Sequence, residues 1–133
     1  MEDFYQLFKG SEQFVDTEFT PDSDSLYWAS EGEEYGAMAA YEPIIEWGRI
    51  IEEFPRLSLF GYDGITPADV RQGTIGNCWF MAGASAVAEV PGRLEKVFLN
   101  NENRVSQTGI YGVNIYTLGV PHTIIIDDWL PLR

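Results

Sequence analysis

The sequence predicts an α+β fold in which one apolar helix packs on a pair of antiparallel strands. An alanine-rich run begins at Cys78 and is closed by Pro91 and Gly92, which is typical of a buried helix. Two apolar segments, 113–117 and 120–126, follow with a glycine between them and predict a hairpin. With 133 residues, of which 45 % are hydrophobic, the chain can form one domain or part of a larger one.

The acidic charge of the chain is concentrated in its first half. The formal net charge is −13, and residues 1–63 hold 15 acidic and 3 basic side chains, against 6 and 5 in residues 64–133. Such a surface repels phosphate backbones, which argues against nucleic acid as a partner, and its plain interpretation is a solvated face. We expect no membrane span, because no stretch approaches the roughly 20 apolar residues required. We expect a cytoplasmic location, because the acidic start is unlike a secretory signal.

We expect two parts in the chain, an acidic lead-in segment at 1–40 and an N-terminal half-domain at 41–133. The lead-in mixes aromatic, acidic and turn residues, so we expect it to wrap a core built by later segments. In the half-domain, Ile44 and Trp47 begin a run of apolar residues at helical spacing that predicts a helix over 43–54.

The segments around the predicted helix and hairpin suggest an incomplete structure. Residues 56–77 are crowded with Gly, Pro, Asp and Asn and predict an ordered loop, and a short helix is expected near 93–99. An isolated hairpin is marginal, and nothing after it is left to supply a third strand, so we expect a fragment or a piece completed by a partner. Asp127 and Asp128 point to opposite faces, which favours a solvated strand end over a metal pair.

The stretch QGTIGNCWF places a thiol at the first turn of the predicted helix. Backbone N–H groups and the positive end of the helix dipole stabilise a thiolate, which is the nucleophilic form. Gln72 lies on a loop that can return its carboxamide to the same point, where it would form an oxyanion hole with the N–H of Cys78. The alternative is that Cys78, beside Trp79 and Phe80, is an inert small hydrophobe.

This stretch resembles the active-site signature of the calpain family of papain-like cysteine peptidases. The resemblance extends over residues 14–133, where FVDTEFTPDSDSLYW, IEWGRIIEEF and TGIYGVNIYTLGVPHTIIIDDWLP are similar to family segments in the same order. It implies a papain-like half-domain in which Cys78 attacks a peptide carbonyl and Gln72 steadies the oxyanion. Asn77 stands where the family usually has Asp, which removes a charge near the thiolate.

The resemblance also implies that the base is missing from this chain. In the family, the imidazole base and the Asn that orients it lie in a second half-domain, more than about 100 residues after the cysteine. The single histidine, His122, lies within a predicted strand beside Ile124, so we expect a structural or surface histidine. This chain alone is therefore expected to be inactive.

Two functions remain open from the sequence. The first is the nucleophile half of a calcium-dependent cysteine endopeptidase that cleaves protein substrates. The second is a non-catalytic calpain-like scaffold or regulatory subunit that buries its cleft face against a protein partner.

Calcium is a further implication of the resemblance, since calpain cores bind one ion in each half-domain. Asp69 matches a carboxylate ligand, and the carbonyls of Tyr62 and Gly64 match the backbone ligands of the family. Calcium takes about six to eight oxygens, which YDGITPAD supplies in part, and a further acidic ligand is expected beyond Arg133. The alternative is that Asp63 and Asp69 are ordinary turn and cap residues.

Overall fold

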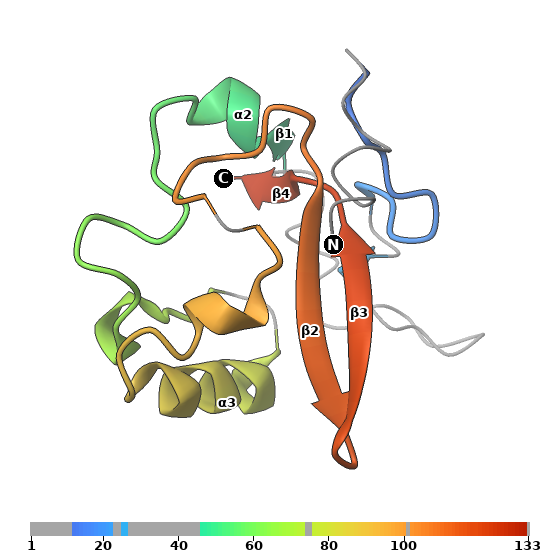
Figure 1. Ribbon diagram of the computed structural model, residues 1–133. Helices are drawn as coiled ribbons and strands as arrows, with labels where there is room; N and C mark the ends of the chain where they lie inside the picture. The colour runs from blue at the N-terminus through green and yellow to red at the C-terminus, as the bar shows by residue number, and fades with distance from the viewer. Residues whose placement is uncertain (1–11, 23–24, 27–45, 74–75, 101, 133) are drawn as a thin grey trace. The chain divides into compact units, whose positions relative to one another are not determined.

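The computed structural model of the protein in Figure 1 describes residues 12–22, 25–26, 46–73, 76–100 and 102–132. These residues form two compact units that alternate along the chain. The first unit lies within 1–55, 107–110 and 126–133, and the second within 56–106 and 111–125. The domain boundary expected at residue 40 and the start of the helix predicted over 43–54 lie outside the described residues. Within the described part of the chain, no helix is long and apolar enough to span a bilayer.

The first unit contains a two-stranded antiparallel sheet. Strand β1 (Glu46–Arg49) pairs with β4 (Trp129–Leu132), and Arg49 lies opposite Trp129. One turn of helix, α2 (Ile50–Glu53), follows β1 directly. Residues after the hairpin do form a strand, β4, but it pairs with β1, so among the described residues the hairpin gains no third strand, as expected.

The helix predicted over 43–54 is wrong at positions 46–49, where the chain is extended. Gly48 is a poor helix former, and the side chain of Leu132 lies so close that no Cβ would fit at this position. Pairing with β4 also satisfies backbone N–H and C=O groups that a helix would have satisfied internally. A contact between residues distant in sequence thus overrides the helical spacing of the apolar side chains.

The second unit contains the helix α3 (Cys78–Ala88) and two turns of 3-10 helix, η3 (Pro67–Asp69) and η4 (Glu95–Val97). The helix begins at the cysteine and ends before Pro91, as predicted. The short helix expected near 93–99 is the single turn η4. Helix α3 contacts η3, and η4 contacts the first strand of the hairpin.

The hairpin consists of β2 (Tyr111–Thr117) and β3 (Val120–Ile126), which pair with each other (Figure 1). Leu118 and Gly119 connect the strands with φ angles of 51° and 81°. Positive φ at both central residues is the geometry of a tight two-residue turn whose twist suits a hairpin. The predicted strand pair is therefore confirmed, together with the glycine turn.

Burial of α3 differs from the sequence prediction. The alanine-rich run predicted a buried helix, but Trp79 is 77 % exposed and Phe80 50 %, while Ala88 is buried. A helix that is apolar on all sides needs cover on several sides. The described residues cover α3 in part, so apolar surface next to the cysteine faces outward.

Candidate functional site

Cys78 is the first residue of α3, and its side chain is exposed. The carbonyl of Asn77 accepts the N–H groups of Phe80 at 3.0 Å and Met81 at 3.1 Å, which closes the first turn. The N–H of Cys78 itself lies at the open end of the helix, where the dipole is positive. The thiol is exposed and therefore accessible, which argues against the interpretation of Cys78 as a buried inert side chain.

Asn77 stands at the N-cap position, but its side chain makes no capping hydrogen bond. Its Oδ1 atom is buried and has no hydrogen-bond partner among the described residues. An N-cap side chain normally accepts an N–H group of the first turn. Among the described residues, Asn77 therefore caps the helix start with its backbone carbonyl and not with its side chain.

Trp79 and Phe80 form an apolar surface immediately after the cysteine. Their rings meet edge to face, with centroids 5.8 Å apart. Aromatic side chains that are exposed beside a polar reactive group are typical of surfaces that contact a peptide or a protein. The start of α3 therefore combines an exposed thiol with exposed aromatic rings.

Gln72 is the other predicted catalytic residue. It is exposed in an irregular stretch of the same unit, and residues 74–75, between it and Cys78, lie outside the described residues. The oxyanion hole from these two residues therefore stays a prediction. His122 is exposed on β3, as expected of a surface histidine.

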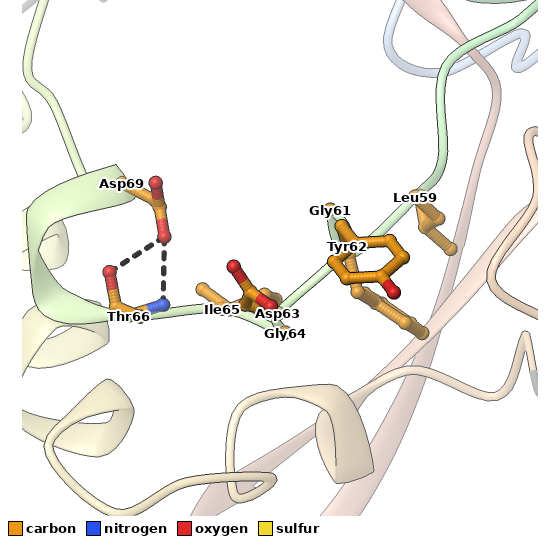
Figure 2. Close-up of a pocket in the computed structure, with 9 residues that line it drawn as sticks. Leu59, Gly61, Tyr62, Asp63, Gly64, Ile65, Thr66 and Asp69 are labelled. Carbon is orange, nitrogen blue, oxygen red and sulfur yellow. Dashed lines mark hydrogen bonds between the residues drawn. The ribbon is translucent and has the colours of Figure 1, made fainter.

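The loop predicted to bind calcium lines an open pocket of about 570 Å³, whose walls all come from residues 59–69 (Figure 2). Gly61 and Gly64 have φ angles of 70° and 81°, which only glycine adopts readily. The side chain of Tyr62, between them, is fully exposed. The pocket is much larger than one ion, so it has space for water ligands as well.

Asp69 closes a capping box at the start of η3. Its Oδ2 atom accepts the N–H of Thr66 at 2.9 Å and the hydroxyl of Thr66 at 2.7 Å, as Figure 2 shows. The hydroxyl and then the N–H of Thr66 lower the pKa of the Asp69 carboxyl. The sequence interpretation of Asp69 as a cap is therefore confirmed.

Glu95 is a carboxylate next to this loop that the sequence reasoning missed. Its Oε1 atom accepts the N–H of Ile65 at 2.9 Å, and its Oε2 atom is buried without a hydrogen-bond partner among the described residues. An unpaired buried carboxylate oxygen is unfavourable unless a donor or a cation satisfies it. Glu95 is not among the residues that line the pocket, and its hydrogen bond goes to the loop backbone at Ile65. The residues that the structure describes contain no cluster of three or more His, Cys, Asp or Glu side chains arranged for a metal.

A buried ion pair in the first unit was also missed. Arg49 Nε lies 2.7 Å from Asp128 Oδ1, and both side chains are almost inaccessible. Asp127 accepts the N–H groups of Asp16 at 2.8 Å and Trp129 at 3.1 Å. The expectation of a solvated strand end at Asp127 and Asp128 is therefore wrong. The available signal was Arg49 itself, the only base between residues 10 and 55.

Comparisons with known proteins agree on one family. The model of the calpain family of cysteine proteases matches residues 14–133. A calpain-type cysteine protease DEK1 from Arabidopsis thaliana is 33 % identical over 129 residues, which cover 92 % of this chain and 6 % of that protein. Calpain-5 from Rattus norvegicus is 32 % identical over 127 residues, which cover 89 % of this chain and 18 % of that protein.

These matches confirm the expected calpain-type half-domain with an α+β fold. The chain spans 6 % and 18 % of the lengths of the two relatives, so it corresponds to a small part of each. Since the family model extends over residues 14–133, the chain belongs to the calpain family of cysteine proteases.

Proposed function

We propose that this chain carries the nucleophile half of a calcium-dependent, calpain-like cysteine endopeptidase. The observation that carries the proposal is the exposed thiol of Cys78 at the first residue of α3, within the stretch that the family model matches. A thiolate at a helix N-terminus is the activated form of a cysteine nucleophile.

In the proposed reaction, the sulfur of Cys78 attacks the carbonyl carbon of a peptide bond, and the carbonyl oxygen takes the negative charge. The backbone N–H of Cys78 and the carboxamide of Gln72 stabilise this oxyanion. Expulsion of the protonated amine leaves a thioester on Cys78, and water then hydrolyses it to an acid and restores the thiol. We place the imidazole that moves these protons in a second half-domain, because His122 is an exposed residue of the hairpin.

We also propose that Asp69 and the carbonyls of Tyr62 and Gly64 hold a calcium ion. When bound, the ion supplies positive charge that keeps these oxygens in one arrangement. Asp69 is the last residue of η3, and η3 contacts α3, so an ordered loop at 62–69 supports the helix that presents Cys78.

We propose that the substrates are proteins and that the location is the cytoplasm. The exposed rings of Trp79 and Phe80 offer an apolar surface beside the nucleophile that an extended peptide can contact. The net charge of −13 disfavours nucleic acid. A single cysteine with no disulfide partner is compatible with a reducing compartment.

The second candidate is a non-catalytic calpain-like scaffold or regulatory subunit. Exposed apolar side chains on the hairpin favour this function. Tyr116 is 68 % exposed, Leu118 100 % and Val120 56 %. Apolar surface of this kind is typical of protein contact sites. In this alternative Cys78 remains accessible to reagents, but no peptide is cleaved.

Cys78→Ser in the natural full-length protein separates these two functions. We expect the unsubstituted protein to cleave an unfolded protein substrate in the presence of calcium and to stop when calcium is chelated. The variant should lose at least about 10³-fold in rate, because it lacks the thiolate. Ser85→Ala, on the same helix but away from its start, is the matched control and should cleave at nearly the normal rate. If the unsubstituted protein cleaves nothing although iodoacetamide alkylates Cys78, the scaffold is supported.

A further inference from the structure

We propose that Asn103 and Glu95 form a two-point brace that sets the backbone of loop 60–65 before any cation binds. The proposal rests on the calcium site proposed above and adds the residues that position it. Neither side chain is suggested as a ligand by the sequence motif. Both lie downstream of the loop, within the segment 95–103 of the same unit.

Asn103 holds the entry of the loop with both of its polar atoms. Its Oδ1 atom accepts the N–H of Phe60 at 2.6 Å, and its Nδ2 atom donates to the carbonyl of Gly61 at 2.7 Å. An amide that pairs with a donor and an acceptor of adjacent residues fixes their orientation. The ring of Phe60 also packs edge to face on Phe98, with centroids 5.3 Å apart, which anchors the same end.

Glu95 holds the exit of the loop. Its Oε1 atom accepts the N–H of Ile65 at 2.9 Å. A Cβ at position 64 would lie 2.8 Å from this oxygen, so the approach of Glu95 requires the glycine that stands there. Gly64 also has a φ of 81°, a conformation that other residues rarely adopt. The position of the Glu95 carboxylate therefore depends on the glycine at position 64.

The segment that provides the brace is itself attached to the hairpin. Leu99 donates its N–H to the carbonyl of Gly112 at 2.8 Å, and Phe98 forms a bridge with Val113. The loop is thus tied at both ends to a hydrogen-bonded part of the unit, whereas Tyr62 between the ties is fully exposed. Holding both ends in advance reduces the ordering that ion binding would otherwise require, which raises affinity without a new ligand.

The test measures two properties of the natural full-length protein in parallel. Amide hydrogen exchange without calcium reports whether Phe60 and Ile65 are held, and calorimetric titration with Ca²⁺ reports affinity. The variants are Asn103→Ala, Glu95→Ala and Glu95→Gln. The matched control is Glu102→Gln, which removes a charge beside Asn103 from an exposed surface pair with Arg104.

We expect Asn103→Ala to speed exchange at Phe60 and to weaken Ca²⁺ binding about 3- to 10-fold, the effect of losing one or two ordinary hydrogen bonds. Asn103 is uncharged, so this loss cannot come from a changed charge. Glu95→Ala should speed exchange at Ile65 and weaken binding by at least as much. Glu95→Gln keeps an acceptor for Ile65, so it should restore the slow exchange and part of the affinity. The control should change neither property by more than about two-fold.

Unchanged affinity in Asn103→Ala and Glu95→Ala, despite faster exchange, would overturn the brace. Equal losses of affinity in Glu95→Gln and Glu95→Ala would show that Glu95 acts through its charge and would overturn its positioning role. If the unsubstituted protein binds no Ca²⁺, the proposed calcium site itself is wrong. This outcome differs from failure of the brace because it is seen in the unsubstituted protein, before any variant is compared.

Discussion

The two units of the protein use carboxylates in opposite ways. In the first unit Asp128 is 1 % exposed and its Oδ1 atom lies 2.7 Å from Arg49. In the second unit Asp69 is exposed, and among the described residues its hydrogen bonds come from Thr66 and it forms no ion pair. A buried carboxylate paired with a guanidinium stabilises the fold, whereas an exposed one that forms no ion pair, and is affected only weakly by the charge of Arg71, remains available to a cation. Burial and ion pairing therefore decide the role of an acid in this very acidic chain.

Arg49 joins three separate stretches of the first unit. Besides its pair with Asp128, it donates from Nη2 to the carbonyl of Phe14 at 2.5 Å and lies 5.3 Å from the ring centre of Trp129. The carboxylate of Asp128 also accepts the N–H of Ile51 at 3.3 Å. Loss of this guanidinium would remove the ion-pair partner of the buried Asp128 and one hydrogen bond to the carbonyl of Phe14.

Arg49→Met should therefore produce the largest change in stability. We expect the first unit to lose about 3–5 kcal/mol, because Asp128 would remain as an uncompensated buried charge. Urea unfolding, with hydrogen exchange to assign the loss to this unit, measures the effect. Arg104→Met is the control, since its pair with Glu102 is exposed and should contribute less than about 1 kcal/mol. Equal losses in the two variants would show that the buried pair does not matter.

The double variant Arg49→Met with Asp128→Leu sharpens the same prediction. Replacing both charges by apolar side chains removes the buried charge, so stability should return in large part relative to Arg49→Met. If the double variant is less stable than the single one, the hydrogen bonds of Asp128 to the backbone outweigh the charge.

Gly64→Ala should lower the stability of the second unit, by less than Arg49→Met lowers that of the first. A left-handed conformation costs a non-glycine residue roughly 1–2 kcal/mol, and the new Cβ would also press on Glu95. Gly83→Ala is the matched control, because position 83 lies in α3 with open space around it. It should stabilise the helix by up to about 1 kcal/mol. In urea unfolding, the free energy of unfolding should fall in Gly64→Ala and rise in Gly83→Ala. A stabilising Gly64→Ala would contradict the geometry of the loop.

Thr66→Val should have the smallest effect, seen as a change in pH dependence. The hydroxyl of Thr66 is the main cause that lowers the pKa of Asp69, so its removal should raise that pKa towards the ordinary aspartate value. In the unsubstituted protein, the hydrogen bond from Thr66 to the Asp69 carboxylate stabilises the fold fully at pH values above the ordinary aspartate pKa. This stabilisation is lost as the pH falls through the lowered pKa of the folded state. The variant should therefore lose less stability on acidification.

Titration of the Asp69 carboxyl carbon by nuclear magnetic resonance measures this change directly. Thr123→Val removes a hydroxyl that donates to Asn114 on the hairpin, so it should leave the Asp69 titration unchanged. An unchanged Asp69 titration in Thr66→Val would mean that the capping hydroxyl does not hold this carboxylate.

Sequence reasoning succeeded where neighbouring residues carry the signal. The start of α3 at Cys78 follows from the change from a glycine-rich loop to an alanine-rich run, and the hairpin turn follows from Gly119 between two apolar strands. It failed for residues 46–49, where apolar spacing suggested a helix, because pairing with 129–132 decides the conformation. The candidate nucleophile and the cap at Asp69 were accessible from the sequence, whereas Glu95 and Asn103 were not.

The sequence by itself determined the helix that begins at Cys78, the hairpin with its glycine turn, the candidate nucleophile and, through the family signature, the class of protein. Only the tertiary structure decided which charges are buried, that Arg49 pairs with Asp128, and that Glu95 and Asn103 hold the loop. The physical reason is that propensities and turn geometry depend on adjacent residues. The free energy of a buried ion pair or of a side-chain hydrogen bond to a distant backbone depends on the surroundings created by the fold.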